Sequence, residues 1–203
     1  MRLNNIDSTD FYSLLDFLKD NVADPYVTGG TLRDYMMGNP KSNDVDLTIG
    51  SPIDVVAALI NGTPFLKSIV EVGKSFGVIR IVLKDGLKVD IAQFRAETYE
   101  EGSRKPTSVT LVKTIEEDLA RRDFTINSMA ARYEGSGEFS LIDPYNGLGD
   151  INNKVIRAVG NPLERFKEDP LRIMRAIRFA VRFKFTIAEG TLGAIKKMKK
   201  EIA

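Results

Sequence analysis

The stretch TGGTLRDYMMGNPKSNDVDLTIG, residues 28–50, holds a Gly-Gly pair, an Arg-Asp pair and two aspartates separated by one residue. Polar and apolar residues alternate over residues 44–49, which predicts a half-buried strand. Because successive strand side chains point to opposite faces, Asp44 and Asp46 share one face of that strand. Two like charges held so close are unfavourable unless a positive partner lies near them. The stretch therefore raises the question of what that partner is.

The composition limits which partner is available. The 203 residues include no Cys and no His, so neither thiolates nor imidazoles can serve as metal ligands or as catalytic groups. Carboxylate oxygens remain, and oxygen ligands favour Mg²⁺, Mn²⁺ or Ca²⁺. A divalent ion shared by Asp44 and Asp46 is one interpretation of the pair. The alternative is that both are charges of an edge strand that face solvent.

The overall composition is that of a globular protein, with 43% hydrophobic residues and no apolar run near the ~20 residues of a membrane span. No signal peptide is recognisable, so we expect a cytoplasmic location and no membrane partner. Residues 154–203 hold 13 Lys/Arg against 5 Asp/Glu, although the net charge of the chain is only +1. This asymmetry indicates metal chemistry in the first part and a polyanion contact in the last part. A solvated helical face would give the same charges, and the sequence does not indicate an oligomeric state.

The order of predicted elements indicates an α+β protein, with a head domain of residues 1–150 followed by an all-helical segment, residues 151–203. Periodicity and capping signals predict helices over residues 8–22, 31–37, 52–60, 115–131 and from about 170 onward. Alternation predicts further strands over residues 69–72, 78–83 and 87–94. The last two strands are joined by a predicted two-residue hairpin turn at Asp85-Gly86. Residues 97–106 and 141–148 are predicted loops.

The glycines at residues 29 and 30 are candidate phosphate ligands. They follow an extended segment and open a helix, a geometry in which backbone N–H groups hold phosphate, although a Gly-Gly pair is more often only a turn. Arg33, in the first helical turn, can contact a phosphate or pair with a carboxylate.

A third carboxylate, Asp90, lies in a predicted strand that is otherwise suited to burial. A buried carboxylate needs a partner. A metal shared with Asp44 and Asp46 would supply one, and Arg95 or Lys88 would be the alternative.

The motifs together resemble the class II tRNA nucleotidyltransferase and bacterial poly(A) polymerase family, within the polymerase-β-like nucleotidyltransferases. GGTLRD at 29–34 followed by DVD at 44–46 resembles the family signature. Further blocks follow in the family's order: VDIAQFR (89–95) with ETY (97–99), EDLARRDFTIN (117–127), IDPYNGLGD (142–150) and EDPLRIMR (168–175). The first block resembles the strand that carries the family's third carboxylate, together with its flexible loop, and the second resembles the nucleotide-binding helix. The third resembles the stretch after that helix, and the fourth resembles the neck motif that selects the base.

The resemblance implies a nucleotidyltransferase head, with a mixed sheet flanked by helices, followed by the start of a helical neck. The implied activity is addition of CCA from CTP and ATP to the 3′ end of tRNA, without a template and with release of pyrophosphate. Such chemistry uses two divalent ions, Mg²⁺ with Mn²⁺ as a possible substitute. The implied metal ligands and catalytic residues are Asp44, Asp46 and Asp90.

The resemblance also implies a set of nucleotide contacts beside Gly29, Gly30 and Arg33. They are Arg122, Asp123, Asn127, Asp169, Arg172, Arg175 and Arg178. Asp169 and Arg172 would read the base, since a carboxylate accepts from the exocyclic amino group that cytosine and adenine share, whereas UTP and GTP present the wrong pattern. An N-cap before Pro170 explains Asp169 equally well. Arg182 extends the same helical stripe of arginines but has no implied role, and a solvated stripe is the alternative for all of them.

Several alternatives stay open at this point. GKSFG (73–77), the block at 143–150 and an intact loop from 95 to 106 favour the CCA-adding branch over an A-adding enzyme or a poly(A) polymerase. Family members continue well past this chain, which ends within the expected neck, so a module that binds nucleoside triphosphates without turnover is an alternative from another class. A structural protein would require the carboxylates, arginines and glycines to be coincidental.

Overall fold

A computed structural model describes residues 1–3, 6–39, 43–70, 77–98 and 108–199. Its main sheet has seven strands in the order β3-β4-β5-β2-β1-β8-β9. Their bounds are β1 Pro25–Thr28, β2 Asp44–Ile49, β3 Leu66–Val70, β4 Val78–Leu83, β5 Lys88–Gln93, β8 Ala130–Gly135 and β9 Glu138–Ile142. The central pair, β2 with β5, is parallel, and all other neighbours are antiparallel, so the sheet is mixed as predicted. A separate hairpin is formed by β6 Arg95–Thr98 and β7 Ser108–Leu111.

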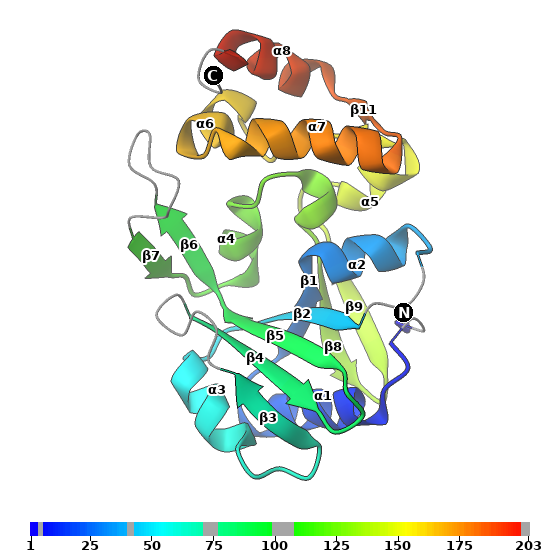
Figure 1. The fold of residues 1–203 in the computed structure, drawn as a ribbon, viewed down its shortest axis with the longest axis vertical. Helices are drawn as coiled ribbons and strands as arrows, with labels where there is room; N and C mark the ends of the chain where they lie inside the picture. Colours follow the sequence, from blue (N-terminus) through cyan, green and yellow to red (C-terminus); the bar gives the residue numbers. More distant parts are fainter. Residues whose placement is uncertain (4–5, 40–42, 71–76, 99–107, 200–203) are drawn as a thin grey trace.

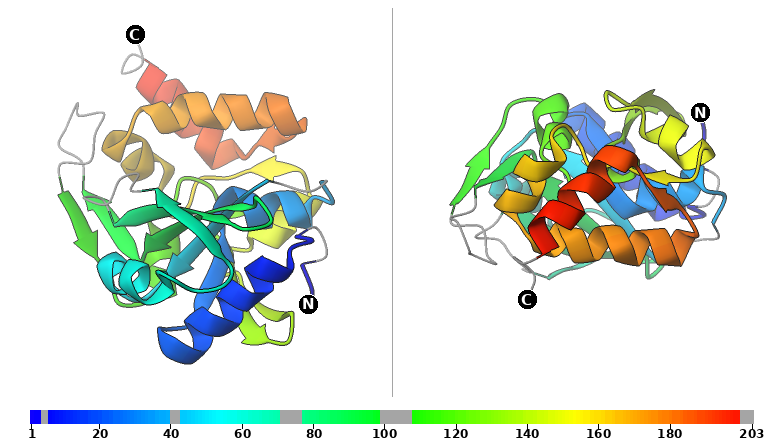
Figure 2. Two further views of the ribbon diagram at one scale, coloured as in Figure 1. Left: turned by 60° about the horizontal axis from the view of Figure 1, so that its bottom comes forward. Right: turned by 90° about the horizontal axis from the view of Figure 1, so that it is seen from above.

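The helices divide between the sheet and the C-terminal end of the chain. Helices α1 Thr9–Asn21, α2 Gly29–Met36, α3 Ile53–Ile60, α4 Ile115–Ala120 and α5 Gly147–Asn152 belong with the sheet, as does a 3₁₀ turn, η2 Thr125–Asn127. Helices α6 Pro162–Glu168, α7 Leu171–Phe183 and α8 Glu189–Met198 form the last part. Figure 1 shows these three together at one end of the molecule, with α2, α4 and α5 between them and the sheet. They also lie together in both views of Figure 2, where α6 packs against α7 and α8.

Most predicted elements are present with small shifts at their ends. Ser8 caps α1 by accepting the N–H of Phe11, and β2 and β4 have the predicted bounds. Helix α2 begins at Gly29 rather than at residue 31, and Pro52 caps α3 rather than forming its first turn. None of the described helices is both long and apolar enough to cross a bilayer.

The predicted helix over residues 115–131 is wrong. Helix α4 ends at Ala120, and the chain then forms η2 and the strand β8. The reason is tertiary, since β8 lies between β1 and β9 and fills both of its hydrogen-bonding edges. The predicted loop at 141–148 is also wrong at both ends, which belong to β9 and α5.

Two predictions on loops lie partly outside the described residues. The structure does not describe residues 73–76 of the GKSFG motif or residues 99–106 of the predicted loop. Residues 97 and 98 of the same loop belong to β6. The predicted division of the chain at residue 150 stays a prediction. One hydrophobic core contains residues from both sides of it, and a short parallel pair, β10 Val155–Ile156 with β11 Thr186–Ile187, accompanies the C-terminal helices.

Gly147 marks a close approach between α5 and η2. A Cβ at this position would lie 2.2 Å from the backbone oxygen of Thr125. Real side chains do not tolerate such a contact, so either α5 or η2 would have to move. Only glycine therefore allows the two segments to pack at this distance.

We expect Gly147→Ala to lower the free energy of unfolding by about 1–3 kcal/mol, because the methyl group overpacks a backbone contact. Gly193→Ala in α8 is the matched control, since a Cβ there meets nothing within 4 Å. The control should raise stability by about 0.5–1 kcal/mol, the usual gain for alanine over glycine in a helix. Urea unfolding measures both variants. Equal effects of the two substitutions would contradict the described packing of α5 on η2.

Candidate active site

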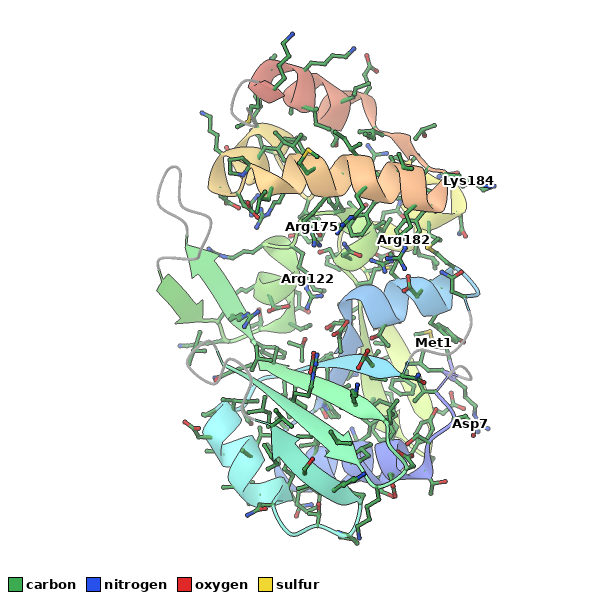
Figure 3. All side chains as sticks on the ribbon, in the orientation of Figure 1. Met1, Asp7, Arg122, Arg175, Arg182 and Lys184 are labelled. Carbon is green, nitrogen blue, oxygen red and sulfur yellow. The ribbon has the colours of Figure 1, made fainter. Side chains whose placement is uncertain are left out.

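A cleft of about 830 Å³ lies between the sheet and α7. It is lined by the start of α2, by β2 and β5, by the turn after α4 and by one face of α7. Figure 3 shows Arg122, Arg175 and Arg182 in the space between α7 and the rest of the molecule. Twelve of the thirteen predicted site residues line the cleft: Gly29, Gly30, Arg33, Asp46, Asp90, Arg122, Asp123, Asn127, Asp169, Arg172, Arg175 and Arg178.

Asp44 is the predicted site residue that does not line the cleft. It is exposed at the first position of β2, whereas Asp46 is half-buried two residues later. No group of three or more acidic side chains in the described part of the chain is placed to hold a metal ion. The structure therefore brings together Asp46 and Asp90, and the role of Asp44 stays a prediction.

Asp46 and Asp90 are neighbours because β2 and β5 are parallel and in register. Asp46 lies opposite Asp90 across that pair, and Asp90 lies opposite Arg80 across the β4–β5 pair. Arg80 donates from Nε and Nη2 to the two oxygens of Asp90, at 2.6 and 2.7 Å. Asp90 thus has a partner that we did not consider from the sequence. The hydrogen bonds and charge of Asp90 raise the pKa of Arg80 above its ordinary value, with smaller contributions from Asp44 and Asp46.

Asp46 is held close to the first turn of α2. Its backbone N–H donates to Thr31 Oγ1 at 2.9 Å, and Thr31 Oγ1 lies 3.4 Å from Asp46 Oδ2. Burial, and then the charge of Asp90, raise the pKa of Asp46, while Thr31 and Arg122 act in the opposite direction. The position therefore favours a cation beside the carboxylate.

Gly29 leaves space for the charged groups around it. A Cβ at this residue would lie 3.3 Å from Asp46 Oδ2 and 3.4 Å from Arg122 Nη1. Its φ of +61° is also in the left-handed region that side chains disfavour. The glycine thus allows a carboxylate and a guanidinium to face the start of α2.

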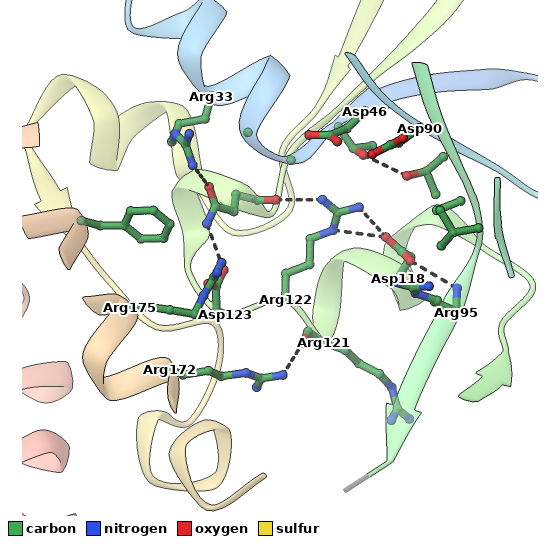
Figure 4. A pocket seen from close by; sticks show the side chains of 18 of the residues that line it. Arg33, Asp46, Asp90, Arg95, Asp118, Arg121, Arg122, Asp123, Arg172 and Arg175 are labelled. Carbon is green, nitrogen blue, oxygen red and sulfur yellow. Dashed lines mark hydrogen bonds and ion pairs between the residues drawn. The ribbon is translucent and has the colours of Figure 1, made fainter. Parts of the chain in front are cut away.

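The side chain of Arg122 is held in place by Asp118 of α4 and by the backbone of Asn127. It donates to Asp118 Oδ2 from Nε and Nη2 at 3.2 and 2.8 Å, and from Nη1 to the carbonyl of Asn127 at 3.2 Å (Figure 4). Asp118 also accepts the backbone N–H of Arg95 through Oδ1 at 3.2 Å. Asp118 thus positions Arg122, and the sequence analysis missed its role. The i, i+4 spacing of the two residues in the motif was the available signal.

A chain of polar contacts links α2 to α7 across the cleft. Arg33 is buried and donates from Nε to Asp34 at 2.8 Å and from Nη1 to Asn127 Oδ1 at 2.7 Å. Asn127 donates to Asp123 Oδ1 at 3.0 Å, and Arg175 donates from Nε to Asp123 Oδ2 at 2.7 Å. Of the two interpretations of Arg33, the structure shows pairing with a carboxylate. The chain holds the side chains of Asp123 and Asn127 in place.

Two aromatic rings of α7 also contact Arg33 of α2. The guanidinium carbon of Arg33 lies 5.3 Å from the ring centre of Phe179 and 4.9 Å from that of Phe183. Arg175 lies 5.2 Å from the same Phe179 ring. Cation–π contacts of this kind stabilise an arginine more when it is desolvated, as Arg33 is. Sequence analysis missed Phe179, whose ring lines the cleft between arginines.

The start of α7 combines structural and exposed polar groups. Asp169 Oδ1 accepts the N–H of Leu171 at 2.9 Å, although Pro170, and not Asp169 as predicted, is the N-cap residue of α7. Arg172 is buried and donates from Nη1 to Glu168 Oε2 at 2.8 Å and from Nη2 to the carbonyl of Arg121 at 3.3 Å. Both residues therefore have structural partners while they line the cleft.

Arg121 and Arg178 differ from the paired arginines. Both are exposed on the cleft lining, and neither guanidinium has a hydrogen bond or ion pair within the described ranges of the chain. The cleft lining includes eight arginines and five aspartates, so it carries net positive charge. Such a site attracts an anion with several charges.

The carboxylates fit a divalent cation by the chemistry of their donors. Asp46 is half-buried and lies opposite Asp90, and the two side chains offer carboxylate oxygens, which hard cations prefer. Nucleotidyltransferases generally use divalent ions to neutralise the charge that moves in phosphoryl transfer.

Comparisons with known proteins agree with this geometry. The pattern of the poly(A) polymerase head domain matches residues 25–157. A CCA-adding enzyme of Staphylococcus aureus (strain Mu3 / ATCC 700698) is 36% identical over 189 residues, which are 93% of this chain and 44% of the relative. The Bacillus stearothermophilus CCA-adding enzyme in complex with CTP has a TM-score of 0.76 at 34% identity, covering 93% of this chain and 43% of that chain. A CCA-adding enzyme with ATP has a TM-score of 0.77 at 34% identity, covering 98% and 44%.

The mixed seven-stranded sheet and its flanking helices are the fold of a polymerase-β-like nucleotidyltransferase head. The chain belongs to the poly(A) polymerase head domain family. It spans less than half the length of the CCA-adding enzymes that it matches. The family predicted from the motifs is therefore confirmed.

The charge of Asp46 should make stability depend on pH in the absence of metal. Because its pKa is raised in the fold, ionisation destabilises the folded state as pH rises above the ordinary value of 3.8. Asp46→Asn removes that charge and keeps a polar group beside Thr31. In EDTA, the variant should melt at the same temperature as the wild type below that pH. It should melt at a higher temperature as pH rises through the raised pKa of Asp46.

Circular dichroism melts over a pH series measure this difference. Asp20→Asn, on an exposed part of α1 outside the cleft, is the matched control and should show no such trend. A lower melting temperature for Asp46→Asn than for the wild type at neutral pH in EDTA would contradict the account of the carboxylates.

Proposed function

We propose that this chain is the head and partial neck of a CCA-adding tRNA nucleotidyltransferase. The reaction adds C and A from CTP and ATP to the 3′ end of tRNA by phosphoryl transfer, without a template, and releases pyrophosphate. The observation that carries the proposal is the single cleft in which half-buried carboxylates face a set of arginines. Relatives named as CCA-adding enzymes, with CTP in one structure and ATP in another, support the choice of substrates.

In this proposal, Asp46 and Asp90 hold Mg²⁺, or Mn²⁺ in its place, with Asp44 as a further ligand. Two bound ions would supply Lewis-acid chemistry, which activates the attacking 3′ hydroxyl and neutralises the triphosphate. The protein contributes a fixed position for the carboxylates, through the register of β2 with β5 and the hydrogen bond from Asp46 to Thr31. The cytoplasm, where tRNA is processed, is the proposed location.

The triphosphate is proposed to lie at the start of α2. Backbone N–H groups of Gly29 and Gly30 point from a helix N-terminus, which favours negative charge. Arg122 lies beside Gly29, and the guanidinium of Arg178, which has no partner in the described part of the chain, lines the same cleft. Arg175, exposed over the ring of Phe179, is proposed as a further contact.

Asp169 and Arg172 are proposed to read the base. Asp169 accepts the N–H of Leu171 through Oδ1, so Oδ2 can accept from an exocyclic amino group. The described contacts of Arg172 leave its Nε–H and one Nη2–H for the base edge. A uracil or guanine would present a carbonyl oxygen to Asp169, which disfavours UTP and GTP. Arg33, Asp123 and Asn127 are proposed to hold the pocket in shape.

The assay that tests the proposal is primer extension. The chain is incubated with Mg²⁺, a tRNA that lacks its CCA end, and CTP or ATP separately or together. We expect two cytidines with CTP alone and the complete CCA end with both nucleotides. Asp46→Asn should lower the rate by about 10²-fold or more, because metal charge stabilisation is worth several kcal/mol. Asp20→Asn is the matched control and should retain the wild-type rate.

Other outcomes identify the alternatives. A long tract made from ATP alone would indicate a poly(A) polymerase, and addition of adenosine only to a tRNA ending in CC would indicate an A-adding enzyme. Mg²⁺-dependent binding of CTP and ATP without extension would indicate a nucleotide-binding module, as the chain's partial coverage of its relatives allows.

A further inference from the structure

Arg80 is a basic residue of β4 that faces the carboxylates of the sheet. Its two hydrogen bonds to Asp90, at 2.6 and 2.7 Å, engage one guanidinium with both carboxylate oxygens. Bidentate pairs of this type are among the stronger charge-assisted contacts in proteins. Arg80 is thus the direct counter-ion of Asp90, one of the two proposed metal ligands that line the cleft.

The three side chains follow one another across neighbouring strands. Arg80 on β4 lies opposite Asp90 on β5, and Asp90 lies opposite Asp46 on β2. Cross-strand neighbours project from the same face of a sheet. A cation that binds between Asp46 and Asp90 would therefore approach a carboxylate whose oxygens already accept from Arg80.

We infer that Arg80 is a positioning residue that competes with the divalent cation for Asp90. This inference rests on the proposed function. Arg80 already occupies one acceptor position on each oxygen of Asp90, and its positive charge repels a cation that binds to the positions that remain. The guanidinium can turn away at modest cost, because the side chain of Arg80 is 39% exposed and that of Asp90 is 30% exposed. Arg80 therefore weakens metal binding and stabilises the metal-free protein.

Binding of Mn²⁺ in the absence of nucleotide tests the competition. Free Mn²⁺ is measured by electron paramagnetic resonance for the wild type and for Arg80→Met, which keeps the apolar stem and removes the guanidinium. We expect Arg80→Met to bind Mn²⁺ roughly tenfold more tightly, or about 1.4 kcal/mol. Mn²⁺ should also raise its melting temperature by more than it raises that of the wild type. If Arg80→Met does not fold, Arg80→Lys should show a smaller gain in the same direction.

The control and the coupled variant make the test specific. Arg132→Met removes an arginine whose side chain is 42% exposed and is paired with Glu134 outside the cleft, with the same change in net charge. It should leave Mn²⁺ affinity unchanged. In an Asp90→Asn background, Arg80→Met should give no gain, because Arg80 acts through that carboxylate.

Two results would overturn the inference in distinguishable ways. If the wild type binds Mn²⁺ in a manner that Asp46→Asn abolishes, but Arg80→Met binds equally or more weakly, then Arg80 does not compete and the proposed function stands. If neither the wild type nor Arg80→Met binds Mn²⁺, then the metal site itself is wrong, and the proposed function fails together with the inference.

Discussion

The parallel register of β2 with β5 places the carboxylate of Asp46 directly beside that of Asp90. The two negative charges repel each other, and the arrangement of the rest of the site depends on this repulsion. Two carboxylates on neighbouring strands need positive charge close by. Arg80 lies on the far side of Asp90, and Arg122 approaches Asp46 across Gly29. The fold thus accepts an unfavourable pair at the centre of its sheet and surrounds it with guanidinium groups.

The sequence predicted the strand of Asp44 and Asp46, the glycine turn and the helix of arginines, because each has a local periodicity. It did not predict that Arg80 pairs with Asp90. A two-residue turn at Asp85-Gly86 would shift the hairpin by one residue, but Leu83 pairs with Leu87 across a three-residue turn. That single residue decides which side chain faces Asp90. The strand β8 was missed for a similar reason, since one of its two pairing partners, β1, lies far earlier in the sequence.

The arginines of α7 illustrate why residue roles are harder to predict than residue positions. Their helical spacing predicted one stripe, and Arg172, Arg175 and Arg178 do line one cleft. Their contacts nevertheless differ. Arg172 is buried against α6 and the turn after α4, Arg175 pairs with Asp123, and Arg178 has no partner among the residues that the structure describes. Periodicity determines the face of a helix, whereas distant partners determine how much hydrogen-bonding capacity remains for a ligand.

We propose that this cleft binds a nucleoside triphosphate through carboxylate-held metal at one end and a base-reading pair at the other. Isothermal titration calorimetry of CTP, ATP, UTP and GTP, each with Mg²⁺ and with EDTA, tests it most directly. The account predicts Mg²⁺-dependent binding of CTP and ATP, at least about tenfold tighter than that of UTP and GTP. Equal affinity for all four nucleotides, or binding that persists unchanged in EDTA, would contradict it.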